Sequence, residues 1–519
     1  MSRSPDHLIT RPPDSSGSFL CIHGHFYQPP RENPWTGEID LQESAAPFHD
    51  WNERILAESY APNADPGPRS GGDRGRYPSN YGRMSFDFGP TLLSWLERKA
   101  APVYEAILEG DRASRSRFSA HGSAMALAYN HMILPLASAR DRRTQVIWGI
   151  RDFEHRFHRS PEGMWLPETA ADAETLDELA RQSIRFTVLA PHQALRHRAK
   201  GEAAWSDAPI DIRRPHDVVL PGGRRLAVFF YDGAASHSVA FGGLAAGGDA
   251  LAHSLRGLST GAGSPSLASV ATDGETFGHH YRGGERVLAE ALDTIESEGE
   301  PRLTNFAEYL GAHPPDREVE IREKSAWSCS HGLGRWTGDC GCKTGEHPDW
   351  SQAWRAPLRE AFDWLRDRLA EIFERKGSEI FADPWTARDD AAEIWLEPVA
   401  AVRHRFFERH ARRPLDAGEE QLAFALLDMQ RNALFMYTSC GWFFDDVGGL
   451  EGRQVLLYAG RAVELARSAG ADGLEAEFLP RLEAARSNVP ERGDARRLYE
   501  QFVASARAAS GGRAADLRG

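Results

Sequence analysis

The stretch ATDGETFGHH (residues 271–280) gathers two carboxylates, two glycines, an aromatic ring and two histidines directly after the apolar-leaning run SLASV (residues 266–270). A surface loop would not need the strand-like run before it. A core strand would not carry Asp273 and Glu275, because carboxylates are rarely buried without partners. The pattern therefore predicts a strand that ends by delivering charged groups into a cleft.

Segments on either side of this stretch alternate between strand and helix patterns. The strand patterns are a short apolar run at 19–22, the β-branched run IRFTVLA at 184–190, and a strand pair at 218–232; the helix patterns cover about 91–109, 144–157, 172–181 and 284–297. Strands that alternate with helices over residues 18–312 indicate an α/β protein with a parallel sheet or a barrel.

After about residue 350 the pattern changes to helices alone. Apolar residues at helical spacing mark a long amphipathic helix, and further helices are expected at about 387–411, 419–437, 452–468, 473–487 and 491–508. We therefore expect four parts: a loose tail at 1–17, a catalytic barrel at 18–312, a Cys- and Trp-rich connecting loop at 313–350, and an all-α domain at 351–519.

The composition limits the kinds of molecule that the chain is expected to bind. The 519-residue chain is longer than one compact core usually allows, and it carries 61 basic against 75 acidic residues, a net charge of −14. This balance disfavours nucleic acid and membrane partners, because phosphate binding needs a basic face. The chain has no run of about 18 apolar residues and no signal-peptide pattern. Five cysteines in so long a chain do not form a disulfide framework. We therefore expect a protein of the reducing cytoplasm. The oligomeric state is not readable from the sequence.

Four segments of the first 300 residues carry the chemistry. They are His23–Pro29 (HGHFYQP), His121–Ser123 with Tyr129–His131, Gly163–Glu168 (GMWLPE), and Asp273–His279 (DGETFGH). Each follows a strand-like or aromatic run, and active sites of α/β barrels are built at the carboxyl ends of strands. The set has no phosphate-binding glycine loop, no nucleophile elbow and no dinucleotide fingerprint. Carboxylates combined with aromatic rings are typical of enzymes that cleave glycosidic bonds.

The ordered motifs resemble glycoside hydrolase family 57, the group of α-amylases, 4-α-glucanotransferases and glycogen branching enzymes. HGHFYQPP matches the opening His-Gln-Pro segment loosely, WLPE at 165–168 matches the nucleophile motif, and DGETFGH at 273–279 matches the acid/base motif. The resemblance covers roughly residues 18–312. It implies a distorted (β/α)7-type barrel, followed here by the helical domain.

The resemblance also implies residue roles. Glu168 would be the nucleophile and Asp273 the general acid/base of a retaining reaction on an α-1,4-glucan or oligosaccharide, without cofactor or catalytic metal. Residues expected to bind substrate are His23, His25, Gln28, His121, Trp165, His279, Trp327, His331 and Trp336. Glu275 is expected to support the site. Each has a plainer interpretation, since single histidines and tryptophans are often core residues and Asp-Gly is a common turn.

A second constellation lies at Trp327–His347, WSCSHGLGRWTGDCGCKTGEH. Four of Cys329, His331, Cys340, Cys342 and His347 could close a tetrahedral zinc site, but the spacing matches no standard finger. We favour a loop that reaches the sugar cleft, and zinc binding stays an alternative.

Two other functions remain open on the sequence alone. His23, His25 and His121 with Asp273 could bind the metal of a carbohydrate deacetylase or an α-mannosidase-like hydrolase. The chain could also be a non-catalytic glucan-binding protein, although it carries both carboxylates. Hydrolysis, transglycosylation and branching are not distinguished by the sequence.

Overall fold

The computed structural model describes residues 17–69, 75–259 and 265–516. The tail expected at residues 1–17 lies, apart from Gly17, outside these ranges. No helix in the described ranges is both long enough and apolar enough to cross a membrane.

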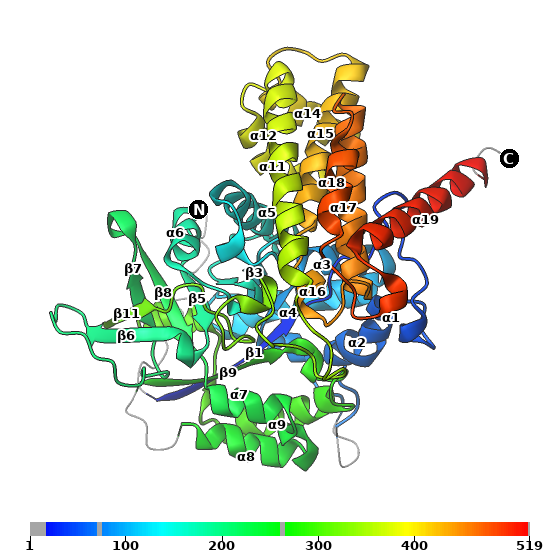
Figure 1. Cartoon of the computed structure of the whole chain (residues 1–519). Coiled ribbons are helices and arrows are strands. Elements are labelled where there is room, and N and C mark those ends of the chain that lie inside the picture. Colours follow the sequence, from blue (N-terminus) through cyan, green and yellow to red (C-terminus); the bar gives the residue numbers. More distant parts are fainter. Residues whose placement is uncertain (1–16, 70–74, 260–264, 517–519) are drawn as a thin grey trace, which may run out of the picture.

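Parallel strands curl into the expected barrel (Figure 1). Their order is β9 (Ser266–Asp273), β1 (Ser18–Phe26), β2 (Ser85–Phe88), β3 (Ala124–Leu127) and β4 (Met164–Trp165). A single parallel bridge from Gly163 to Phe186 adds β5 (Phe186–Leu189), which pairs with β8 (Arg225–Phe230). The Asp232 N–H, just after β8, donates to the Ser269 carbonyl of β9 at 2.7 Å. Together with β10 (Arg302–Leu303), which also pairs with β1, these strands form the curled wall of the distorted barrel.

Side-chain alternation along β1 explains why the sheet is buried on both faces. Phe19 and Cys21 pack inside the barrel, whereas Leu20 and Ile22 pack against the outer helices. Successive side chains of a strand point to opposite faces, so the inward set continues to His23 and His25 at the carboxyl end.

Helices cover the outside of the barrel. They are α3 (Pro90–Lys99), α4 (Ala101–Arg117), α5 (Ala139–Phe157), α6 (Ala173–Arg181), α7 (Gly233–Ala240), α8 (Gly248–Gly257) and α9 (Gly284–Glu298). The single helix expected at 91–109 is two helices broken at Ala100, where the backbone leaves the helical region; Pro102 lies in the first turn of the next helix. Asp172 caps the N-terminus of α6, because its carboxylate accepts from the Thr175 N–H at 2.8 Å.

A second sheet projects from one side of the barrel, at the left of Figure 1. Its order is β5, β8, β7 (His216–Val219), β11 (Arg317–Ile321) and β6 (Ala194–Ala199). The expected hairpin at 218–232 is the antiparallel β7–β8 pair. Residues 313–350 were expected to be a connecting loop, but β11 pairs with β6 and β7, so this region starts as part of the sheet.

The C-terminal region is helical, as predicted, and its long helices stand upright above the barrel in Figure 1. It contains α11 (Arg355–Ile380), α12 (Pro384–Asp390), α13 (Ala392–Leu396), α14 (Ala400–His410), α15 (Ala417–Phe435), α16 (Cys440–Phe443), α17 (Leu450–Ser468), α18 (Leu474–Leu482) and α19 (Ala495–Asp516). The single helix expected at 387–411 is divided among α12, α13 and α14.

The helical region and the barrel share one hydrophobic core. Tyr129 and Trp148 of the barrel pack in the same cluster as the apolar faces of α11, α15 and α17. The buried Arg388 of α12 donates to Asp141 at 2.8 Å and to Thr144 at 2.9 Å on α5. The two regions are therefore joined by apolar packing and by a buried ion pair.

Candidate active site

The carboxyl ends of the barrel strands open into a cavity of about 1070 Å³. Its wall includes residues at or shortly after the ends of strands β1, β4, β8 and β9, namely Tyr27, Glu168, Tyr231 and Asp273. Residues of the connecting segment and of the helical region complete the wall, namely Trp327, Ser328, Arg335, Glu346, Cys440, Phe443, Phe444, Leu450 and Glu451. Both halves of the chain thus build one site.

Glu168 reaches the cavity through an unusual turn. Strand β4 ends at Trp165, and Glu168 and Thr169 then adopt φ of 58° and 49°, a region that side chains other than glycine seldom occupy. The turn is held in place because the Trp327 N–H donates to the Glu168 carbonyl and the Thr169 hydroxyl donates to Gln193. Backbone strain of this kind persists only where the surroundings enforce it, and it is frequent at active sites.

The Glu168 carboxylate receives two hydrogen bonds on one oxygen. Trp327 Nε1–H donates to Oε2 at 3.0 Å, and the Ser328 hydroxyl donates to the same atom at 2.5 Å. Burial raises the pKa of Glu168, and the charge of Asp273 acts in the same direction. The two donors and the positive charge of His25 oppose this rise, because they stabilise the ionised form.

Asp273 ends strand β9, and its side chain faces the cavity. Among the described residues, no hydrogen-bond donor contacts its carboxylate. Its side chain is open to the cavity, but desolvation by the surrounding barrel mouth raises its pKa, the positive charge of His25 lowers it, and the charge of Asp87 raises it. The two carboxyl groups therefore share a cavity but differ in their donors, which is how neighbouring acids take different protonation states.

Glu275 also borders the cavity but is only 5% exposed. Its Oε1 accepts from the Tyr60 hydroxyl at 2.6 Å and from the Tyr27 N–H at 3.1 Å. Burial raises the pKa of Glu275 to about 8, despite the Tyr60 hydrogen bond and with help from the Asp273 charge. This raised pKa favours the protonated form of Glu275 near neutral pH, and its supporting role stays a prediction.

A chain of hydrogen bonds runs from the barrel floor to the helical region. Asp87 binds His23 Nε2 at 3.0 Å and His25 Nδ1 at 2.8 Å, and His25 Nε2 lies 3.1 Å from His131 Nε2. His131 Nδ1 in turn lies 2.6 Å from the Ser439 hydroxyl.

The pKa directions assign protons along this chain. Burial disfavours a charged His25, but its attraction to Asp87 prevails and raises its pKa to about 9. Burial and the charge of His25 hold the pKa of His131 well below its usual value. A charged His25 therefore donates to a neutral His131, which donates onward to Ser439.

The expected binding residues fall into three groups. His25, Gln28, His279 and Trp327 line the cavity with both carboxylates. His23 and Trp165 lie buried behind it, stacked with ring centroids 4.5 Å apart. The others lie elsewhere: His121 binds Glu162 at 2.8 Å before strand β3 begins, Trp336 is buried in the helical core, and His331 lies among cysteines.

Sequence reasoning missed several functional positions. Asp87 carried a signal, since it is an acid inside the apolar strand SFDF. Ser328 and Ser439 carried none, because they reach the site only through tertiary contacts. The segment around Cys440 joins the helical region to the barrel through the Ser439 N–H to His131 carbonyl bond, and it also lines the cavity.

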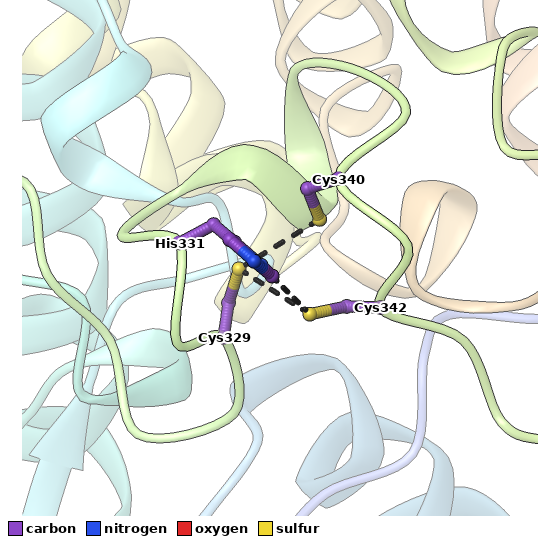
Figure 2. A group of neighbouring side chains, drawn as sticks. All are labelled: Cys329, His331, Cys340 and Cys342. Atoms are coloured by element: carbon purple, nitrogen blue, oxygen red, sulfur yellow. Dashed lines mark hydrogen bonds between the residues drawn. The ribbon is translucent and has the colours of Figure 1, made fainter.

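Metal-ligand geometry occurs at one place in the described ranges. The ligand atoms of Cys329, His331, Cys340 and Cys342 lie within 4.8 Å of one another, and Figure 2 shows these side chains converging. His347 does not join them, because its ring stacks on Trp350 at 3.7 Å. At the barrel mouth, His23 and His25 bind Asp87 instead, and His121 lies at the opposite end of the strands.

Solved structures show the same fold at low identity. An exo-type maltose-forming amylase from Pyrococcus sp. ST04 is 16% identical with a TM-score of 0.64, and 89% of this chain covers 82% of it. A family 57 branching enzyme from Thermococcus kodakaraensis is 14% identical with a TM-score of 0.54, covering 93% of both chains. An α-amylase from Thermotoga maritima is 12% identical with a TM-score of 0.51, covering 93% of this chain and 99% of that one.

Two family models match separate parts of the chain, and these parts correspond to the barrel and the helical region. No curated protein matches the chain. Residues 350–516 match a domain of unknown function (DUF3536), which corresponds to the helical region. Residues 84–322 match Glycosyl hydrolase family 57, and this match includes β2 to β5, β8 and β9 with both cavity carboxylates. Within the barrel, residues 84–322 therefore match the sequence model of glycosyl hydrolase family 57.

Proposed function

We propose that the chain is a retaining enzyme acting on α-1,4-glucans, with Glu168 as nucleophile and Asp273 as general acid/base. The observation that carries the proposal is that both carboxylates face one cavity, while hydrogen-bond donors from the described part of the chain contact Glu168 and not Asp273. The amylases and the branching enzyme that share the fold support α-glucan as the substrate class.

Glu168 has the environment that a nucleophile needs. A carboxylate attacks the anomeric carbon only when ionised, and Trp327 and Ser328 stabilise that form with two hydrogen bonds. Both donors bind Oε2, so Oε1 is left to form the bond to the sugar. The resulting glycosyl-enzyme is then released by attack of water or of another sugar on the same carbon.

Asp273 has the environment that a general acid needs. Burial raises its pKa, which favours a proton on the carboxyl group until the glycosidic oxygen takes it. In the second half-reaction the same group, now ionised, accepts a proton from the attacking hydroxyl. The charged His25 nearby stabilises this ionised state.

The cavity wall suits a carbohydrate chain. Aromatic rings of Tyr231, Trp327 and Phe443 line it, and Phe241 and Phe444 are 77% and 40% exposed at its edge. Exposed rings stack on the apolar faces of sugars, and the volume lies at the upper end for ligand pockets, which suits an oligosaccharide.

Proton NMR of amylose and maltoheptaose, incubated with the wild-type chain and with Glu168→Gln, tests the proposal. New α-1,6 signals identify a branching enzyme, shorter and longer α-1,4 chains identify a glucanotransferase, and a rise in reducing ends alone identifies a hydrolase. Each activity should vanish in Glu168→Gln and persist in the control Glu162→Gln, whose carboxylate binds His121 and Arg185 outside the cavity. Untouched substrates with a folded wild-type protein would reject α-1,4-glucan as the substrate.

A further inference from the structure

The segment that donates to Glu168 continues directly into the Cys/His group of Figure 2. Ser328 is followed by Cys329, and His331, Cys340 and Cys342 complete the group. Cys329 Sγ lies 3.9 Å from Cys340 Sγ and 3.8 Å from Cys342 Sγ, and Cys342 Sγ lies 3.5 Å from His331 Nδ1. All three thiols are free.

These separations match the edges of a zinc tetrahedron. With Zn–S of about 2.3 Å, Zn–N of about 2.05 Å and tetrahedral angles, two sulfurs lie about 3.8 Å apart, and a sulfur and a nitrogen lie about 3.6 Å apart. Each of the three distances agrees to within about 0.1 Å. A disulfide would need its two sulfurs at about 2.05 Å, so the arrangement fits a shared ion rather than a covalent pair.

The surroundings of the group suit a bound ion. Cys329 is 3% exposed, and Cys340 and Cys342 pack against the helical core. Three thiolates with one Zn²⁺ leave one negative charge, and the Arg355 guanidinium donates to the Cys342 carbonyl at 2.9 Å. Gly334 allows the close approach, because a Cβ there would lie 2.8 Å from Cys340 Cβ.

We propose that Cys329, His331, Cys340 and Cys342 bind one structural Zn²⁺ that fixes the segment carrying Trp327 and Ser328 against Glu168. The donor set of three thiolates and one imidazole is typical of closed structural zinc sites. Between residues 326 and 345 the segment contains only one short helical turn, Gly334–Trp336, so regular structure does little to order it. The metal would supply that order, and Arg335 adds a hydrogen bond to the Ser328 carbonyl at 3.3 Å.

Metal content of the purified full-length chain is the first test, and it does not depend on the activity proposed above. Elemental analysis of protein prepared under reducing conditions without chelator should give one zinc per chain. Replacement with Co²⁺ should produce the absorption of tetrahedral cobalt with thiolate ligands. A folded wild-type chain that holds no zinc, even after incubation with zinc chloride, would overturn the proposal.

Two histidine variants provide a matched comparison. His331→Ala should lose zinc, whereas His347→Ala should keep one equivalent, because His347 stacks on Trp350 outside the group. Cys342→Ser should lose zinc, and Cys21→Ala, in the barrel interior, should keep it. Equal zinc content in His331→Ala and His347→Ala would contradict the assigned ligands.

The ordering role has its own readout. Lys343 directly follows Cys342, so trypsin should cleave after Lys343 faster in chelator-treated protein than in the zinc form. His331→Ala should be cleaved like the chelator-treated wild type, and His347→Ala should resist. Identical cleavage rates with and without zinc would show that the ion does not order the segment.

Discussion

The floor and the roof of the cavity contribute different things to one site. The floor consists of side chains at or near the ends of barrel strands, with His25, Glu168 and Asp273 among its ionisable groups. The roof consists of cavity side chains from residues 327–346 and 440–451, among them Trp327 and Ser328. The floor supplies the ionisable groups. The roof supplies the hydrogen-bond donors that make the environment of Glu168 different from that of Asp273. Two carboxyls that burial shifts in the same direction can therefore take opposite roles.

The largest effect is expected from the floor carboxylates. Glu168→Gln should lower kcat by about four orders of magnitude or more, since it removes the nucleophile. Asp273→Asn should lower kcat on amylose by about 10²- to 10⁴-fold, the usual contribution of general acid catalysis. Steady-state assays with amylose measure both losses.

An activated substrate separates the two roles. The first bond cleavage in α-maltosyl fluoride needs no proton donor, so burst-phase fluoride release should be retained by Asp273→Asn and lost by Glu168→Gln. Equal loss of the burst in both variants would mean that the roles are not divided as proposed.

The next effect concerns the junction between the barrel and the helical region that bears part of the roof. Arg388→Met removes the partner of the buried Asp141 and should lower the free energy of unfolding by about 3–5 kcal/mol. Urea titration followed by circular dichroism measures the change.

Arg151→Met is the control for this junction. It removes an exposed ion pair with Glu154 on the same helix α5, so its effect should stay below about 1 kcal/mol. If Arg388→Met and Arg151→Met destabilise equally, the helical region is not joined to the barrel by this buried pair.

A smaller effect is expected from the roof donors. Ser328→Ala removes one hydrogen bond to the Glu168 carboxylate, worth about 1.5–3 kcal/mol, and should lower kcat by about 10- to 100-fold. Losing a donor to the ionised form raises the pKa of Glu168 further. The acidic limb of the pH profile of kcat/KM should therefore move to higher pH.

Thr337→Ala tests whether this shift is specific. Its hydroxyl donates only within its own segment, to the Leu333 carbonyl, so its pH profile should match the wild type. If the acidic limb of the pH profile does not move in Ser328→Ala, the roof donor Ser328 does not control the pKa of Glu168.

The smallest effect is expected at Glu275. Its pKa of about 8 exceeds its ordinary value of 4.5, so between these values the folded protein holds a proton that the unfolded chain releases. The stability from this proton is fully present below about pH 4.5 and is lost as the pH rises through about 8. Glu275→Gln imitates the protonated form and should retain neutral-pH activity within a few-fold.

Thermal melts of the wild type and Glu275→Gln at several pH values show the difference. The melting temperature of the wild type should fall relative to that of the variant as the pH rises from about 5 to about 8. Parallel melting curves across this range would show that Glu275 carries no such proton.

The floor could be predicted from the sequence because each of its residues lies close in sequence to the strand that positions it. Asp273 ends a recognisable strand pattern and Glu168 follows a short aromatic run, and carboxyl ends of parallel strands meet at one edge. The same rule explains His121, which precedes strand β3 and so lies at the opposite edge, bound to Glu162. The positive φ of Glu168 was not visible, since no glycine marks the turn.

The roof could not be predicted because its contacts cross long stretches of chain. The Trp327 donor is 159 residues from Glu168, and Ser439 is 308 residues from His131. Local patterns predicted α11 and α15 but not which surface of the helical region meets the barrel. The Cys/His spacing likewise matched no standard finger, although the folded segment brings four ligand atoms together.

The most direct test of the central claim is to trap the glycosyl-enzyme. Asp273→Asn incubated with α-maltosyl fluoride should form the covalent intermediate and release it slowly, because the general base is missing. Mass spectrometry of the digested protein should find one maltosyl group on the peptide containing Glu168, and none in the Asp273→Asn/Glu168→Gln double variant. A maltosyl group on another residue, or no adduct while the wild type turns over maltosyl fluoride, would contradict Glu168 as the nucleophile.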